Sequence, residues 1–343
     1  MKLLICTQAV DETHPILGFF VSWIVAFAKR FESVEVITLE EGQHQLPKNV
    51  RVRSLGKERG SSKVMQFVRF YWFFFWAIVR LRPRYVFFHM GAIYNVLSTP
   101  FFWVRKIWGG TFYWWKTHGQ IDALGARALQ VVDRVYTAAP ESFPIVTPKR
   151  RVVGHAIDID LFAPEEGVAK DIDVLFAGRF SRTKRIEQVI ETTRRLVADG
   201  HDLRVVLVGE PVDQDYFEEI KTLIDTHQLS AVIKIMPAVQ QDELVALYRR
   251  AVVFMNPSEH DGLDKVILEA MASGAIPLTG NLSFRELLGR HGLFVKKGDI
   301  AAFSRVIQKV MSMPTAERES LSQRLRDAVM SEHALSTLVD RIF

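Results

Sequence analysis

The sequence predicts an α/β protein with two parallel β-sheets, each in its own domain. Short apolar runs alternate with amphipathic helical segments along the whole chain, and this is the pattern of parallel strands joined by crossover helices. An acidic stretch of small residues interrupts the alternation at 154–170. Because 343 residues are enough for two domains, we expect a first domain at 1–153, a linker at 154–170 and a second domain at 171–330.

Apolar runs and amphipathic segments define the strands and helices of the first domain,. Strands are expected at 3–7, 34–39, 85–90, 111–117, 135–138 and 151–153. Helices are expected at 17–31, where Phe20, Trp23 and Phe27 share a face, and at 61–81, 93–108 and from about 122.

The second domain repeats the same alternation. Strands are expected at 174–177, 204–208, 232–235, 251–255 and 276–278. Helices are expected at 186–198, 213–227, 240–249, from Asp264 to Gly274, and then at 301–311, 316–330 and 334–342. Asp264 is a favourable N-cap residue, and Gly274 supplies a C-terminal stop.

Composition limits the class of protein. The chain is 48% hydrophobic and 24% charged, as in an ordinary globular protein,. Cys6 is the single cysteine, which excludes an internal disulfide and a cysteine-based metal site and fits a reducing cytosol. The apolar stretch at the N-terminus is too short for a signal peptide. We therefore expect a cytoplasmic protein.

Positive charge and aromatic residues are concentrated in the first half. Residues 1–165 hold 21 Lys and Arg against 13 Asp and Glu, and all seven tryptophans. Such an asymmetry indicates an anionic partner, either a membrane surface or a nucleic acid. No segment resembles a nucleic-acid reading module, so we do not expect nucleic-acid binding.

The helix at 61–81 contains the run FYWFFFWAIV at 70–79, followed by three arginines. The run is too short to span a bilayer. Two alternatives remain: a helix at the interface of an anionic membrane, or a core helix between sheet faces. The interfacial alternative predicts membrane contact, and peripheral attachment to the inner face of the cell membrane, through Arg69, Trp72, Phe75, Trp76 and Arg80.

The segment 256–280 joins a strand, a polar loop and a helix. Ligands of open α/β sheets bind where such strands end, and backbone N–H groups at a helix N-terminus favour an anion. The backbone at 262–265 could hold a phosphate while Asp261 and Glu269 accept hydrogen bonds from hydroxyls. The alternative is a capping Asp and a solvated Glu.

Two further loops carry candidate ligand contacts. The loop at 177–185 brings four cations to a helix N-terminus, namely Arg179, Arg182, Lys184 and Arg185. Guanidinium and ammonium groups in this setting suit a diphosphate, whereas the alternative is a solvated basic patch. His118, followed by Gly119, ends a strand and is placed to reach a ligand, although a single histidine is more often structural.

Three segments resemble motifs of glycosyltransferase family 4, a large family of retaining, nucleotide-sugar-dependent enzymes with the GT-B fold. They are GRFSRTK at 178–184, similar to G-R-L-x-x-x-K; GHAID at 154–158 with LFAP at 161–164, similar to N-G-V-D-x-x-x-F-x-P; and DGLDKVILEAMASG at 261–274, similar to E-G-F-G-L-x-x-L-E-A-M-A-x-G. The resemblance implies two Rossmann-like domains facing a central cleft, with a C-terminal helix, 331–343, packing back toward the first domain.

The resemblance also implies roles for individual residues. Arg179 and Lys184 would neutralise the departing diphosphate in place of a metal, so that no metal and no cofactor are expected. The backbone of Gly262, Leu263, Asp264 and Lys265 would hold sugar and phosphate, and Glu269 would bind the ribose. Asp261 and His118 would lie against the donor sugar. Gly18 would belong to the loop that covers the diphosphate.

The function implied is transfer of a sugar from a nucleotide-diphosphate sugar to a lipid-linked or glycan acceptor, with retention of anomeric configuration. The alternatives are an epimerase or hydrolase of nucleotide sugars, and a non-catalytic scaffold that binds them at a membrane. Three departures concern donor recognition: Asp261 replaces Glu, LDK at 263–265 replaces F-G-L, and the first loop lacks a Gly-Gly pair around Gly18.

Overall fold

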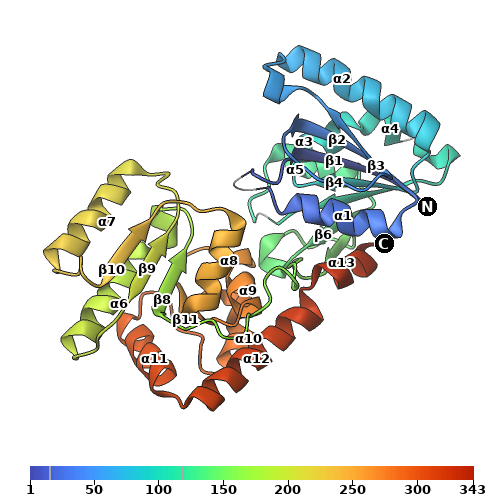
Figure 1. Cartoon of the computed structure of the whole chain (residues 1–343). Helices are drawn as coiled ribbons and strands as arrows, with labels where there is room; N and C mark the ends of the chain where they lie inside the picture. The colour runs from blue at the N-terminus through green and yellow to red at the C-terminus, as the bar shows by residue number, and fades with distance from the viewer. Residues whose placement is uncertain (15–16, 103, 118) are drawn as a thin grey trace. The chain divides into compact units, whose positions relative to one another are not determined.

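The computed structural model describes residues 1–14, 17–102, 104–117 and 119–343, without the side chain of residue 106. The chain divides into two compact units (Figure 1). The first comprises Met1–Ala156 together with Leu335–Phe343, and the second comprises Ile157–Ala334. The division falls within the stretch expected to be a linker. The prediction of an α/β protein with two parallel sheets is confirmed.

The first unit contains a seven-stranded parallel sheet of order β3-β2-β1-β4-β5-β6-β7. Its strands are β1 (Lys2–Val10), β2 (Ser33–Glu41), β3 (Val50–Ser54), β4 (Tyr85–His89), β5 (Thr111–Trp115), β6 (Arg134–Thr137) and β7 (Arg150–Val152). The four consecutive residues Leu3 to Cys6 are fully buried, because a parallel sheet is covered on both faces.

Helices of the first unit cover both faces of this sheet. They are α1 (Phe20–Arg30), α2 (Lys63–Trp76), α3 (Ala92–Leu97), α4 (Thr99–Phe102), α5 (Ala123–Gln130) and α13 (Leu335–Ile342). The C-terminal segment packs onto α1. There the ring of Phe343 meets those of Phe27 and Phe87, and the hydroxyl of Tyr136 donates a 2.8 Å hydrogen bond to the carbonyl of Ile342.

Two details of the first unit differ from the prediction. The single helix expected at 93–108 is wrong, because the chain forms α3, α4 and a 3₁₀ turn at Val104–Ile107 instead. Pro100 lacks the N–H that a continuous helix needs, and the Ser98 hydroxyl donates to the Asn95 carbonyl at 2.7 Å where α3 ends,. The strand β3 was not predicted; it is a five-residue edge strand that alternates valine and arginine.

Helix α2 has one buried face and one exposed face. A π-helical turn, Ala77–Leu81, extends it. The buried face carries Phe70, Phe74, Ala77 and Ile78, which pack in the core with strand residues of the sheet. The helix lies along the outside of the unit (Figure 1). Its opposite stripe is apolar and exposed, with the members Val64, Val68, Trp72, Phe75 and Val79. Each alternative proposed from the sequence therefore describes one face of the helix.

The second unit contains a five-stranded parallel sheet of order β10-β9-β8-β11-β12. Its strands are β8 (Ile172–Ala177), β9 (Val205–Val208), β10 (Ile233–Met236), β11 (Ala251–Asn256) and β12 (Ile276–Thr279). Its helices are α6 (Ile186–Ala198), α7 (Gln214–Thr226), α8 (Gln241–Arg250), α9 (Lys265–Ala272), α10 (Arg285–Gly289), α11 (Ile300–Ser312) and α12 (Thr315–Glu332).

The strand order of the second sheet fixes the position of its site. The chain runs from β8 outward to β9 and β10, then returns to the other side of β8 with β11. At such a reversal, the loops after the two central strands diverge and leave room for a ligand. The two loops singled out in the sequence follow β8 and β11, so both lie at this point.

Candidate functional site

The loops after β8 and β11 are in direct contact. The backbone N–H of Glu259 donates to the carbonyl of Thr183 at 3.0 Å, and the hydroxyl of Ser258 donates to the same carbonyl at 3.3 Å. Sequence motifs roughly eighty residues apart are thereby joined into one site.

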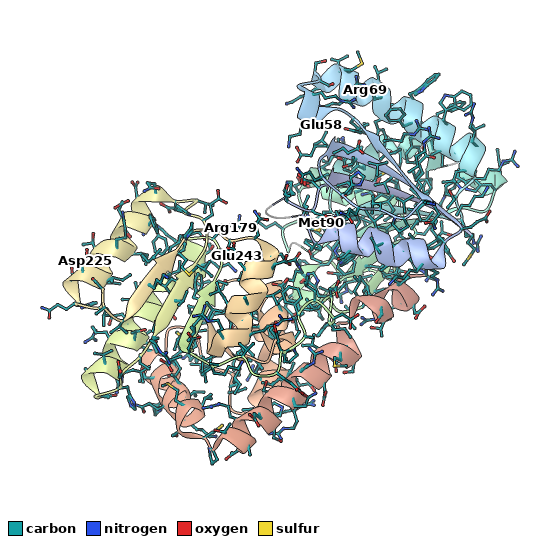
Figure 2. All side chains as sticks on the ribbon, viewed as in Figure 1. Glu58, Arg69, Met90, Arg179, Asp225 and Glu243 are labelled. Carbon is teal, nitrogen blue, oxygen red and sulfur yellow. The ribbon has the colours of Figure 1, made fainter. Side chains whose placement is uncertain are left out.

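The four cations of the first loop have different partners. The Arg182 guanidinium forms two hydrogen bonds with Glu219 of α7, at 2.6 and 2.9 Å, and Arg185 lies 3.1 Å from Glu187. Arg179, at the end of β8 (Figure 2), is exposed and has no polar side-chain partner in the described part of the chain. The four cations therefore do not form one uniform cluster: Arg182 and Arg185 are paired with glutamates, Arg179 is open, and Lys184 faces the loop after β11.

Lys184 is mostly buried and bound to Asp264. Its ammonium lies 2.9 Å from Oδ2 of Asp264, and the amide of Asn256 donates to the same oxygen at 3.1 Å. Asp264 precedes α9, as predicted, but its carboxylate makes no capping hydrogen bond. The capping role was wrong because the carboxylate is turned toward Lys184. The uncapped N-terminus of α9 retains the partial positive charge that attracts anions.

Asp261 is held by the segment that follows β12. Lys297 donates to its Oδ1 at 2.6 Å, and the backbone N–H of Leu282 donates to the same oxygen at 3.0 Å. Burial raises the pKa of Asp261, but these hydrogen bonds lower it further than burial raises it. The carboxylate is therefore ionised at neutral pH and acts as an acceptor.

Glu269 is buried within the second unit, with 5% of its surface exposed. Its Oε1 lies 2.7 Å from the ammonium of Lys265, one turn earlier on α9. The hydroxyl of Tyr248 donates to Oε2 at 3.4 Å, and burial and the nearby carboxylate raise the pKa of this tyrosine. The alternative of a solvated Glu269 is wrong, because the side chain lies in the core beside α8.

The backbone at 262–264 is positioned by a buried asparagine. Asn281 has no exposed surface, and its amide donates to the carbonyl of Gly262 at 2.8 Å. Sequence reasoning missed Asn281, Lys297, Tyr248 and the side-chain role of Asn256. Three of these four come from other segments of the chain, and no spacing rule connects them to the loop.

The two remaining site residues belong to the first unit. His118 lies outside the described residues, so its role stays a prediction. Gly18 precedes α1, and a Cβ at this position would lie 2.6 Å from the Glu12 carbonyl oxygen and 2.9 Å from that of His14. The backbone therefore requires glycine here, and contact with a donor stays a prediction.

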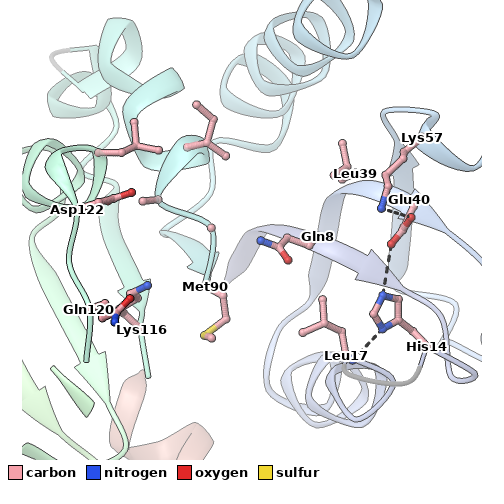
Figure 3. A pocket seen from close by; sticks show the side chains of 14 residues that line it. Gln8, His14, Leu17, Leu39, Glu40, Lys57, Met90, Lys116, Gln120 and Asp122 are labelled. Carbon is pink, nitrogen blue, oxygen red and sulfur yellow. Dashed lines mark hydrogen bonds and ion pairs between the residues drawn. The ribbon is translucent and has the colours of Figure 1, made fainter. Parts of the chain in front are cut away.

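The first unit has a pocket of its own, of about 740 Å³ and with a mixed polar and apolar lining, at the end of its sheet where β1, β4 and β5 terminate (Figure 3). Glu40 lies 2.8 Å from the Lys57 ammonium and 3.4 Å from Nε2 of His14, whose Nδ1 accepts from the N–H of Leu17. Burial lowers the pKa of Lys116, while Asp122 opposes this shift. The lining is Gln8, His14, Leu17, Leu39, Glu40, Lys57, Met90, Gly91, Ala92, Ile93, Lys116, Gln120, Asp122 and Leu124.

Comparison with solved structures identifies the fold class. HepE of Anabaena, solved in complex with UDP, superimposes with a TM-score of 0.78 at 15% identity, over 100% of this chain and 98% of that one. The chain thus has the two-sheet architecture of GT-B glycosyltransferases.

Comparison with sequences identifies the second unit more closely. Residues 159–328 match the model of the family Glycosyl transferases group 1. This segment, which contains both loops of the site, is therefore a glycosyl transferases group 1 domain.

Two curated relatives extend the likeness. The D-inositol 3-phosphate glycosyltransferase of Geodermatophilus obscurus is 29% identical over 58% of this chain, but the alignment spans only 46% of that protein. The GDP-mannose:cellobiosyl-diphosphopolyprenol alpha-mannosyltransferase of Xanthomonas oryzae pv. oryzae is 23% identical over 88% of this chain and 86% of its own length.

Proposed function

We propose that this protein is a retaining glycosyltransferase that moves a sugar from a nucleotide-diphosphate sugar to a lipid-linked or glycan acceptor. The observation that carries the proposal is the contact between the loops after β8 and β11. This contact brings Lys184 to Asp264 at the uncapped N-terminus of α9, the helix that carries Glu269 and follows Asp261, in a glycosyl transferases group 1 domain. The UDP complex of HepE supports a nucleotide donor.

In this proposal the side chains supply charge and position. Arg179 and Lys184 stabilise the negative charge that develops on the departing diphosphate, and no metal or cofactor is required for that step. Buried Glu269 accepts hydrogen bonds from the ribose hydroxyls, while Asp261 and His118 lie against the transferred sugar. Catalysis then consists mainly of orienting the acceptor hydroxyl and stabilising the leaving group.

We propose that the acceptor binds to the first unit, in the pocket lined by Glu40, Lys57, Lys116 and Asp122. Carboxylates, ammonium groups and two glutamine amides offer both donors and acceptors, as a polyhydroxylated acceptor requires. A lipid-linked acceptor accords with the diphosphopolyprenol substrate in the name of the Xanthomonas relative.

We propose further that the protein is cytoplasmic and attached to the inner face of the cell membrane through α2. By length and composition the helix Lys63–Leu81 could cross a membrane, with 22% of its most apolar window buried. Its buried face packs against the sheet, so we favour a helix that lies in the interface. Trp72 and Phe75 would enter the lipid, and Arg80, stacked 4.4 Å over the Trp76 ring, would meet anionic headgroups,. Arg69 instead donates to Leu55 and Ser61.

The proposal is tested by incubating the purified protein with UDP-glucose or GDP-mannose and membrane lipid extract, and following labelled sugar. Transfer to a lipid or glycan with retained anomeric configuration is expected. Release of free sugar, or a changed sugar on the nucleotide without any acceptor, would instead identify a hydrolase or an epimerase. Binding without turnover would identify a scaffold.

A further inference from the structure

Asp264 is the feature of the site that the diphosphate alone does not explain. Its carboxylate is 2.9 Å from the ammonium of Lys184, and an ammonium contacts a phosphate oxygen at about 2.8 Å. A diphosphate bound to Lys184 would therefore lie within about 6 Å of a second negative charge, and the two would repel each other across a partly buried site. This carboxylate opposes the ligand for which Lys184 is placed.

The orientation of the carboxylate is fixed from one side. The buried amide of Asn256 accepts from the N–H of Ser258 at 3.2 Å, so its Nδ2 must point toward Asp264. Both Asn256 and Lys184 donate to Oδ2. The other oxygen, Oδ1, has no hydrogen-bond partner among the residues that the structure describes, and 17% of the Asp264 side chain is exposed. One oxygen is anchored and the other can receive donors.

We propose that Asp264 recognises the transferred sugar, with Oδ2 anchoring Lys184 and Oδ1 accepting hydrogen bonds from sugar hydroxyls. The inference rests on the proposed function. In a nucleotide sugar the sugar is bonded directly to the terminal phosphate, so its hydroxyls lie beside the group that Lys184 contacts. Hydrogen bonds from these hydroxyls to Oδ1 offset the repulsion between the Asp264 carboxylate and the phosphate. A free nucleoside diphosphate has no hydroxyls at that end and leaves the repulsion uncompensated.

The consequence is a difference between two ligands. We expect the wild-type protein to bind UDP-glucose more tightly than UDP, or GDP-mannose more tightly than GDP, and Asp264 to be responsible for much of that ratio. Asp264→Asn keeps the shape and removes the charge, and Asp264→Gly restores the residue found in the resembling motif. Both variants are expected to bind the nucleoside diphosphate at least as tightly as the wild type.

The experiment is calorimetric titration of the full chain with each of these four ligands. The measured quantity is the dissociation constant of the nucleoside diphosphate divided by that of the nucleotide sugar. Because hydrogen bonds to a charged acceptor are stronger than neutral ones, D264N should lower this ratio about tenfold. D264G should lower it further. Asp171→Asn is the matched control, because Asp171 pairs with Arg250 away from both loops; its ratio should equal that of the wild type.

An unchanged ratio in D264N and D264G would overturn the inference. So would an equal loss of affinity for the diphosphate and the nucleotide sugar, because that result would show that Asp264 only positions Lys184. If the wild-type protein bound none of the four ligands, the proposed function itself would fall. Melting temperatures of the variants separate these results from loss of folding.

Discussion

At the scale of single residues, His89 is a titratable group that folding holds neutral. It ends β4 with its side chain fully buried, its Nδ1 lies 3.1 Å from the Thr7 hydroxyl, and its ring stacks on Phe20 at 3.7 Å. Burial, with a smaller contribution from His155, lowers its pKa to about 3. The folded protein therefore excludes a proton that the unfolded chain takes up near pH 6.5.

This shift predicts acid sensitivity of the first unit. The stabilisation from neutral His89 is complete above pH 6.5 and is lost as the pH falls toward 3, by up to about 1.4 kcal/mol per pH unit. Between pH 7.5 and 5 the loss should approach about 2 kcal/mol. Tryptophan fluorescence follows urea unfolding of this unit, since all seven tryptophans lie within residues 1–165. The His89→Gln variant should lose less free energy of unfolding over the same pH range. An equal loss in both proteins would show that His89 is not the group responsible.

Residue-level roles could be predicted where a role depends on local sequence. The loops at 178–185 and 256–264 were found from strand ends, glycine and charge, and the structure brings them into contact. The pairing of Lys184 with Asp264 could not be predicted, because its partners are 80 residues apart in the sequence. The ion pair of Arg182 with Glu219 could not be predicted for the same reason, since only the fold brings α7 beside that loop.

At the scale of secondary-structure elements, α2 explains why its sequence supports two interpretations. Periodicity cannot separate two faces when both are apolar, so an interfacial and a buried helix were equally compatible with the run at 70–79. Packing separates them, since Phe74 is fully buried while Val68, Trp72 and Phe75 are exposed by 55%, 60% and 46%. Similarly, Pro100 was the local signal that could have divided the helix expected at 93–108.

The exposed stripe of α2 predicts binding to anionic vesicles. Replacing Val68, Trp72 and Phe75 with serine should release the protein from vesicles rich in phosphatidylglycerol, because these side chains supply the apolar surface that would enter the lipid. The melting temperature should stay close to that of the wild type. Sedimentation with vesicles measures the bound fraction.

A matched control replaces the exposed Val146 and Val212, which lie outside α2, with serine. This variant should bind vesicles as the wild type does. If the α2 variant remained bound, or if it unfolded, the exposed stripe would not be the membrane contact.

At the scale of the whole molecule, the alternation of strands and helices was sufficient to predict two parallel sheets. In each sheet the strand order reverses beside the first strand of that half of the sequence, β1 in the first sheet and β8 in the second, and in the second sheet this reversal creates the site. The family resemblance implied that a C-terminal helix at 331–343 packs toward the first domain, and Leu335–Phe343 does belong to that unit. No local pattern indicates this packing, because it depends on aromatic contacts of Phe343 with residues far away in the sequence.

Metal-independent binding of a nucleotide sugar by the second unit, through Lys184, is the proposal on which the others depend. A ligand that binds only the folded protein raises its melting temperature by mass action. The most direct measurement is therefore the melting temperature with UDP-, GDP-, ADP- and dTDP-sugars, with and without EDTA, for the wild type and three variants.

We predict that one nucleotide class stabilises the wild type equally with and without EDTA. Lys184→Ala, or equally Glu269→Ala, should abolish the shift. Arg182→Ala, which removes a cation of the same loop that is committed to Glu219, should retain it. A shift that requires divalent metal, or one that survives in Lys184→Ala, would contradict the account.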